Sequence, residues 1–497
     1  MLVLSITEAN YFPKMKITTD EKDDFLYHQV AERLGQQIEN NTLKAGDKLI
    51  SLRALSREQG ISLSTAYKAF IELENKGYVE ARPKSGYFVR YKPARRLKKQ
   101  TFPHFPSERA EIDVDEMIRQ VYRTLSGDGM VRLSLAVPPV ELIPVAKLNK
   151  ALMEAVRNSP ESCTNYDEIP GNLNLRKQIA RYAFNWGGNV TADEIITTHG
   201  CMEAVAFCLK AVTEPGDTIA IESPVYFGIF NVIKILGLKV FEVPSDPQEG
   251  PDIDFLEKAL DSVPIKACLF VTNFSNPTGA LMPDNRKKQL VEMLAAREIP
   301  MIEDDIYGEM YFGKSRPKTC KSFDKKGLVM LCSSVSKTLA PGYRVGWCIP
   351  GKFWDKVISN KITQTVSSAT PTHAAIGIFF ETGRYDLHMR NLRKALHTQS
   401  LRYIQAVTEH FPPDTQISRP QGGYVLWIEL NTKINAFELF EAAILQNVSI
   451  APGQIFSTDA RFTNYIRISF GAPFTTEIDA GLKRLGALIK SLEDLSE

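Results

Sequence analysis

The N-terminal part of the chain carries a clear helical repeat of apolar positions. Tyr27, Val30, Leu34 and Ile38 recur at helical spacing, and the polar, glycine-containing stretch 40–48 follows them. Apolar residues three and four positions apart line one face of a helix. The pattern therefore predicts an amphipathic helix that ends near residue 40.

Two shorter helices are predicted after that stretch. Ser51 can cap the first, which stops near Gly60, and Ser62 can cap the second. The inner face of the second helix is apolar: Ala66, Phe70 and Leu73. Strands at 78–82 and 87–90 then flank a turn. Three helices and a hairpin predict a winged helix-turn-helix, whose second capped helix is free to enter a DNA major groove.

The longer C-terminal part alternates apolar runs with helical patterns. Such alternation predicts an α/β fold with a mostly parallel sheet. The expected strands are 194–198, 218–221, 266–271, 299–302 and 328–332. Polar residues follow nearly all of these strands at the carboxyl end, where open α/β sheets bind ligands.

The expected domains are a winged helix-turn-helix at 22–91 and a large α/β domain at 113–497. The segment 92–112 between them is basic and contains Pro103 and Pro106, which predicts a semi-stiff linker. Two interpretations of the linker stay open: a plain solvated tether, or a tether that also contacts the DNA backbone.

Composition indicates a soluble, multidomain protein. The 497 residues are 44% hydrophobic and 24% charged. The seven cysteines show neither CxxC pairs nor metal-ligand spacing, which predicts a reducing, cytoplasmic location and no metal site. No signal peptide and no membrane-spanning window are found in the sequence. Residues 21–100 hold 16 Lys and Arg against 10 Asp and Glu, so an anionic partner is expected for that end.

Lys337 lies in a setting that suits covalent binding of pyridoxal phosphate. It follows an apolar run, is surrounded by hydroxyls such as Ser334 and Ser336, and precedes Arg344 by seven positions. A lysine that forms a Schiff base needs a rigid strand end, and the hydroxyls and guanidinium suit a phosphate. The alternative is an ordinary solvated lysine.

Other strand ends carry residues that fit the same cofactor. The turn at Gly200 enters a helix N-terminus, which suits a phosphate. Tyr226 can stack on a pyridine ring, and Asn276 and Tyr307 can share the phenolate oxygen. Asp304 is expected opposite the pyridine nitrogen. Asp305 is the alternative for this role, and Glu303 is expected to face a partner helix or solvent.

The N-terminal pattern resembles the DNA-binding domain of the GntR family. The matching residues are Leu49, Ser51, Leu52, Arg53, Leu55, Ile61, Ser62, Ser64, Thr65, Ala69, Leu73, Gly77, Tyr78, Gly86 and Val89. The resemblance implies that DNA meets a set of residues on the capped helices and the wing: Arg53, Ser62, Ser64, Thr65, Tyr67, Lys68 and Gly86.

Two positions depart from that family. Leu63 and Tyr67 stand where basic residues are usual. Either the operator is read differently, for instance through thymine methyl groups, or the affinity is modest. A winged helix that binds protein instead of DNA is the remaining alternative.

The C-terminal region resembles fold type I aminotransferases, and the whole chain resembles the MocR subfamily of GntR-type regulators. Asn276 and Asp304 are 28 residues apart, and Asp304 and Lys337 are 33 apart, as in that family. The resemblance implies that pyridoxal phosphate is held by Gly200, Cys201, Met202, Tyr226, Asn276, Asp304, Tyr307, Ser334, Ser336, Lys337 and Arg344. It also implies that Tyr166 reaches the phosphate of a second subunit in a homodimer, and that Arg467 binds a ligand carboxylate. The alternative for Arg467 is a surface arginine on an edge strand.

Three functions follow from these resemblances. The first is a transcriptional regulator of a double-stranded DNA operator, in which an amine or amino-acid effector replaces Lys337 in the Schiff base. The second is an active aminotransferase with an appended DNA-binding module. The third is a regulator that senses pyridoxal phosphate itself. The winged helix favours the two regulators, because catalysis alone does not need it.

Overall fold

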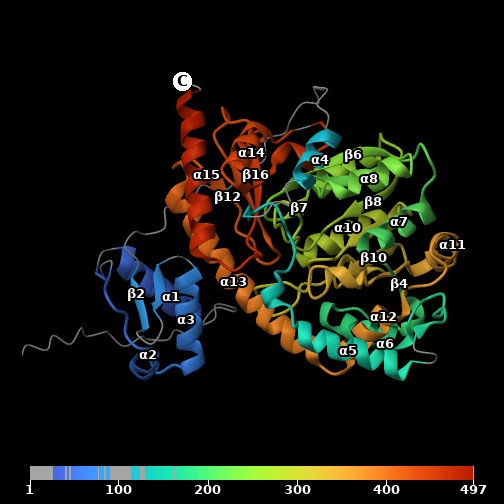
Figure 1. Cartoon of the computed structure of the whole chain (residues 1–497), viewed down its shortest axis with the longest axis horizontal. Coiled ribbons are helices and arrows are strands. Elements are labelled where there is room, and N and C mark those ends of the chain that lie inside the picture. The colour runs from blue at the N-terminus through green and yellow to red at the C-terminus, as the bar shows by residue number, and fades with distance from the viewer. Residues whose placement is uncertain are drawn as a thin grey trace, which may run out of the picture. The chain divides into compact units, whose positions relative to one another are not determined.

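The chain forms two compact units, residues 1–96 and 97–497, and each is considered by itself. The computed structural model (Figure 1) describes residues 26–39, 42–43, 46–75, 78–82, 86–89, 114–123, 129–159, 163–459 and 461–495. The expected linker at 92–112, Gly77 and most of the turn at 83–86 lie outside these ranges.

The N-terminal unit is a three-helix winged helix-turn-helix. Its elements are α1 (Leu26–Glu39), α2 (Leu52–Gln59), α3 (Leu63–Asn75), β1 (Val79–Arg82) and β2 (Gly86–Val89), with β1 and β2 antiparallel. Ser51 Oγ accepts a hydrogen bond from Ala54 N over 3.2 Å and starts α2, and Gly60 ends it at φ 66°. Ser62 Oγ accepts from Thr65 N over 3.0 Å and starts α3. These caps confirm the helix starts predicted at Ser51 and Ser62.

The second unit is built on a mostly parallel sheet of eight strands in the order β4-β11-β10-β9-β8-β5-β6-β7. The strands are β4 (Ile196–Thr198), β5 (Thr218–Ser223), β6 (Lys239–Asp246), β7 (Gly250–Pro251), β8 (Ile265–Phe270), β9 (Met301–Asp304), β10 (Val329–Ser334) and β11 (Gly346–Ile349). Only β11 and β7 run antiparallel to their neighbours. The five predicted strands are present, while β6, β7 and β11 were not predicted.

Helices cover both faces of this sheet. They include α7 (Cys201–Val212), α8 (Gly228–Ile235), α9 (Ile253–Leu260), α10 (Asp284–Ala296) and α11 (Trp354–Gln364). In β5, Ile219 and Ile221 join the core of α7, α8 and α11, and Ala220 joins that of α9 and α10. Successive strand residues point to opposite faces, so an uninterrupted apolar strand is what a sheet covered on both faces requires.

A smaller sheet in the order β12-β13-β16-β15 completes the second unit. Figure 1 shows β12, β16, α14 and α15 gathered beside the large sheet. The remaining elements are β3 (Val131–Arg132), β12 (Gln416–Ile417), β13 (Val425–Glu429), β14 (Val448–Ser449), β15 (Ala451–Pro452), β16 (Tyr465–Ser469), α4 (Val114–Arg123), α5 (Val145–Asn158), α6 (Leu173–Ala183), α12 (Thr370–Glu381), α13 (Arg384–His410), α14 (Ala436–Leu445) and α15 (Thr476–Leu495).

All seven cysteines are free thiols. In the described ranges no helix is both long enough and apolar enough to cross a membrane. The same ranges contain no group of three or more His, Cys, Asp or Glu side chains that could hold a metal ion.

Candidate functional site

The parallel strands bring the chemistry-bearing residues to one edge of the large sheet. Asp304 ends β9 and is paired with Cys332 of β10, the strand that leads to Lys337. Gly200 follows β4, and β4 is joined to β10 through β11. Because β4, β9 and β10 point the same way, their carboxyl ends meet at this edge, as the sequence predicted.

Asp304 is a buried carboxyl with two donors. Cys201 Sγ donates to Asp304 Oδ1 over 3.1 Å, and Ile306 N donates to the same oxygen over 3.1 Å. Burial raises the pKa of the Asp304 carboxyl from 3.8 to about 6, although both hydrogen bonds and the Lys337 charge oppose the rise. A carboxyl poised this way can hold or release a proton near neutral pH.

Lys337 is fixed at both its amine and its backbone. Its Nζ donates to Ala136 O over 2.6 Å, and its carbonyl oxygen accepts from the Tyr424 hydroxyl over 2.6 Å. Burial lowers the pKa of the Lys337 ammonium from 10.5 to about 8, and the Arg467 charge adds to this, while Asp304 opposes it. A much larger fraction of the amine is therefore neutral at pH 7 than in an ordinary lysine. The alternative of an ordinary solvated lysine is wrong, because the Lys337 side chain is half-buried and its amine is hydrogen-bonded to a backbone carbonyl.

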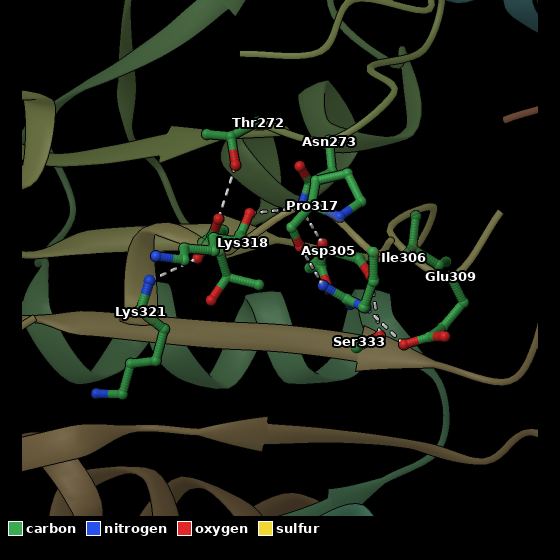
Figure 2. A network of polar contacts seen from close by, with 12 residues as sticks. Thr272, Asn273, Asp305, Ile306, Glu309, Pro317, Lys318, Lys321 and Ser333 are labelled. Carbon is green, nitrogen blue, oxygen red and sulfur yellow. Dashed lines mark hydrogen bonds and ion pairs between the residues drawn. The ribbon is translucent and has the colours of Figure 1, made fainter. Parts of the chain in front are cut away.

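Asp305 lies in a network of polar contacts that is separate from those of Asp304 (Figure 2). Asn273 Nδ2 donates to Asp305 Oδ1 over 2.7 Å, and the Arg316 guanidinium pairs with Oδ2. Arg316 also donates to Glu309 over 2.6 Å, and Lys287 Nζ donates to Asn273 Oδ1 over 2.7 Å. These hydrogen bonds and the Arg316 guanidinium hold the Asp305 carboxylate in place.

Glu303 is fully buried. Of the two expected surroundings, solvent is therefore wrong, and a neighbouring helix is found. It accepts hydrogen bonds from Thr272 Oγ1 over 2.7 Å, from Cys320 N over 2.7 Å and from Lys321 N over 3.0 Å. Cys320 opens a short 3-10 helix, Cys320–Phe323. Carboxylates stabilise the unpaired N–H groups at such helix starts.

Arg467 brings the small sheet into this site. Its Nη1 donates to Asn276 Oδ1 over 3.1 Å, and its guanidinium carbon lies 5.4 Å from the centre of the Phe456 ring. Asn276 Nδ2 lies 3.4 Å from the Tyr307 hydroxyl. Arg467 is only 3% exposed and lies on β16, between β13 and β15. The alternative of a surface arginine on an edge strand is therefore wrong.

Gly200, Arg344 and Ser336 form a set of donors that fits a phosphate. Gly200 has φ 96°, and a Cβ there would lie 2.4 Å from Arg344 Nη2. Arg344 donates to His199 O over 2.9 Å and lies 3.4 Å from Ser336 Oγ. The positive φ favours glycine at this position, and a side chain there would displace the Arg344 guanidinium from the turn.

Further donors stand beside this guanidinium. Cys201 and Met202 occupy the first turn of α7, where N–H groups lack intrahelical partners. Ser334 Oγ accepts from Ser336 N over 3.2 Å, which orients the loop between β10 and Lys337. Because neither Cys201 nor Met202 offers a hydroxyl, backbone N–H groups must supply the donors in this turn.

Two of the three tyrosines predicted for the cofactor, Tyr226 and Tyr166, differ in their surroundings. Tyr226 is half-buried, and its ring centre lies 4.8 Å from that of Phe227. A Cβ on Gly228 would lie 2.4 Å from the Tyr226 ring, so the glycine makes room for it. Tyr166 is 84% exposed, and a tyrosine this exposed is available to a second molecule.

The residues predicted to meet DNA all lie in the N-terminal unit. Ser62 Oγ lies 2.7 Å from Ser64 Oγ and 2.8 Å from Thr65 Oγ1, which makes a hydroxyl cluster at the start of α3. Arg53, Tyr67, Lys68 and Gly86 are exposed, and Gly86 has φ 102° at the start of β2.

Several participants were not predicted from the sequence. Tyr424 holds the Lys337 carbonyl, Phe456 lies beside Arg467, and the carbonyls of Ser134 and Ala136 accept from Arg467 and Lys337. Carbonyl acceptors carry no side-chain signal. Tyr424 follows the pair Gly422-Gly423, and this was the one local hint that the segment approaches another closely.

Comparison with known proteins places both units in families. The aminotransferase class I and II profile matches residues 128–485, and the profile of bacterial regulatory proteins of the gntR family matches residues 26–89. Two uncharacterized HTH-type transcriptional regulators of Escherichia coli, YjiR and YdcR, are each 36% identical, over 94% and 93% of this chain and 99% of each relative. The chain belongs to the MocR-like regulators of the GntR type.

This MocR-like chain therefore joins a GntR-type helix-turn-helix domain to a fold type I aminotransferase domain, which confirms the predicted fold class. A solved structure of LysN, an α-aminoadipate aminotransferase from Thermus thermophilus complexed with N-(5'-phosphopyridoxyl)-L-leucine, matches it with a TM-score of 0.71 and 26% identity. That match covers 76% of this chain and 95% of LysN.

Proposed function

We propose that this protein is a cytoplasmic, homodimeric transcriptional regulator that senses an amine or amino acid through pyridoxal phosphate bound at Lys337. The observation that carries the proposal is that Asp304 ends β9 beside β10, the strand that leads to Lys337, and that Arg467 contacts Asn276 at the same edge, in a chain that also has a GntR-type domain. An amine, a proton-holding carboxyl and a buried guanidinium are the groups that such a sensor needs.

Pyridoxal phosphate, when bound, supplies an aldehyde carbon that forms a Schiff base with an amine. Lys337 would provide that amine, Asp304 would hold the proton of the pyridine nitrogen, and Asn276 with Tyr307 would contact the phenolate oxygen. Tyr226 would stack on the ring. The phosphate would be held by Gly200, Cys201, Met202, Ser334, Ser336 and Arg344.

Arg467 would give the site its preference for carboxylates. An effector amine that takes the aldehyde carbon from Lys337 would place its own carboxylate at the guanidinium. Since Arg467 already contacts Asn276 and lies over Phe456, the carboxylate would change contacts in the loop after β8 and in the 3-10 helix Gly453–Phe456. A ligand that binds two conformations unequally shifts their populations, and this is the route by which the DNA-binding units would respond.

Exposed Tyr166 supports the homodimer, since the resemblance assigns it to the phosphate of a second subunit and it lies open in one chain. The DNA operator would be contacted by Arg53, Ser62, Ser64, Thr65, Tyr67, Lys68 and Gly86. A dimer would read two half-sites, with an affinity that falls as salt rises.

The second candidate is an active aminotransferase, and the likeness to LysN favours it. A regulator that responds to pyridoxal phosphate itself is the third. One experiment separates the three: titrate the holoprotein with a panel of amines and amino acids, and follow its visible spectrum and its affinity for the DNA upstream of its own gene.

Our proposal expects one ligand class to change the spectrum and the DNA affinity together, without steady production of oxo acid. Steady turnover with unchanged DNA affinity would contradict it in favour of the enzyme. A response of DNA affinity to the cofactor alone would favour the third candidate.

A further inference from the structure

The outer face of α3 carries an apolar stripe where DNA would meet it. Leu63 is 50% exposed and Tyr67 is 43% exposed, and residues four apart lie one above the other on a helix. The opposite face is buried in the core of the unit by Ala66, Ala69, Phe70 and Leu73. Leu63 and Tyr67 therefore point outward together.

Charge places the contact at the N-terminal half of α3. The first turn has no acidic residue, and Lys68 is exposed on the following turn. The acidic residues come later: Glu72 is paired with His28 at 2.5 Å, and Glu74 accepts from Ala81 N over 3.2 Å. Phosphates would be repelled at the far end, so only the first two turns suit close approach to DNA.

Hydroxyls flank the stripe at the helix start. Ser62, Ser64 and Thr65 are joined through the Ser62 hydroxyl, within 2.7 and 2.8 Å. Hydroxyls at a helix N-terminus suit phosphate contacts, which position a helix but carry little sequence information. Contacts to the base edges must therefore come from other exposed side chains of α3, and Leu63 and Tyr67 are the apolar ones.

We propose that Leu63 and Tyr67 make this protein select operators by the 5-methyl groups of thymine. The thymine methyl is the apolar group on base edges in the major groove, and a guanine contact would need the arginine or lysine that is absent at these positions. Leu63 would contact one thymine methyl group with its branched apolar end, and Tyr67 would contact a neighbouring one with its ring. The inference rests on the proposed DNA-binding function and specifies which bases that surface prefers.

The test begins with selection of binding sites from random-sequence duplexes by the full-length holoprotein. Each thymine of the selected site is then replaced singly by deoxyuridine, which removes the methyl group and leaves the base-pairing edge intact. We expect at least one replacement to weaken binding about fourfold, the factor that corresponds to burial of one methyl-sized group.

The same duplexes are then measured with Leu63→Ala, Leu63→Met, Tyr67→Ala and Lys68→Ala. The sensitivity to one methyl should vanish in Leu63→Ala or Tyr67→Ala, and it should survive in Leu63→Met, which keeps an apolar contact. Lys68→Ala should weaken all duplexes alike and keep the discrimination. Leu63 is half exposed, so these variants should fold, and circular dichroism checks this.

Specific binding with no loss at any deoxyuridine position would overturn the inference and leave the DNA-binding proposal standing. Equal methyl sensitivity in wild type, Leu63→Ala and Tyr67→Ala would overturn it as well. If no duplex is enriched and the stripe binds a protein instead, both the inference and the proposed function are wrong.

Discussion

Arg467 Nη1 donates a hydrogen bond to Asn276 Oδ1 over 3.1 Å, which ties the small sheet to the loop that follows β8. The other end of the same amide faces the Tyr307 hydroxyl at 3.4 Å. The orientation of Asn276 is thus set from both sides. In our proposal a carboxylate at Arg467 would share the guanidinium with this amide, so effector binding and the cofactor surroundings would be linked through Asn276.

Arg467→Ala should weaken the response to amino-acid effectors by about 30-fold or more, since truncating one partner of a buried charged contact costs about 2–5 kcal/mol. Amines without a carboxylate should lose far less. The matched control is Arg393→Ala, which removes an arginine stacked 4.3 Å from the Tyr311 ring centre. Spectral titration with an amino acid and with its decarboxylated amine measures both effects. Equal losses for the two ligands would contradict a carboxylate-binding role.

The neighbouring aspartates should respond differently to the same change. Asp305→Asn removes one of the two carboxylates that pair with buried Arg316 and should lower the free energy of unfolding by about 3 kcal/mol, because Glu309 remains as a partner. Asp304→Asn should lower it little, because burial already disfavours the charged form. Asp304→Asn should instead weaken cofactor binding and alter the visible spectrum. Denaturant unfolding beside cofactor titration tests this pair, and the reverse pattern would assign the pyridine nitrogen to Asp305.

The rate at which the apoprotein takes up pyridoxal phosphate should rise with pH and level off above about pH 8. The reactive form is the neutral amine, and burial lowers the pKa of Lys337 to about 8. The free energy of unfolding should also rise with pH between about pH 8 and 10.5, because the Lys337 amine binds a proton there in the unfolded chain but not in the folded one. Lys337 therefore costs stability below pH 8, and this cost is relieved as pH rises above 8. A rate that climbs without a plateau to pH 10 would indicate an unperturbed lysine.

Arg53→Ala should weaken DNA binding and reduce its salt dependence by about one counterion, because Arg53 is exposed near the start of α2. Cofactor uptake should not change. Lys239→Ala, an exposed cation on β6 of the other unit, is the charge-matched control. Electrophoretic shifts at several salt concentrations measure the slope. An unchanged slope would place Arg53 outside the DNA interface.

The sequence predicts this fold well where one local cause decides the structure. Ser51 and Ser62 start helices because their hydroxyls cap them, and the apolar runs around Ile219 and Leu331 are strands because both sheet faces are covered. The strand β11 was missed because it opens with Gly346, a residue that is unfavourable in strands and is required here where the backbone meets Gly200.

The sequence could propose the side chains of the candidate site, but it could not predict the backbone groups that hold them. Lys337, Asp304 and Asn276 could be proposed because each ends or follows a strand. The partners that hold them could not: Lys337 donates to a carbonyl 201 residues away, and Arg467 to one 333 residues away. Carbonyl oxygens are the same in every residue, so only the folded chain identifies them.

Reduction of the holoprotein with borohydride, followed by peptide mass spectrometry, tests the central claim most directly. The Schiff base is thereby trapped as a stable amine on the lysine that formed it. The account predicts one modified peptide, carrying the phosphopyridoxyl group on Lys337, and none from Lys337→Ala. A modified lysine elsewhere in wild type, or no modified peptide in yellow protein, would contradict it.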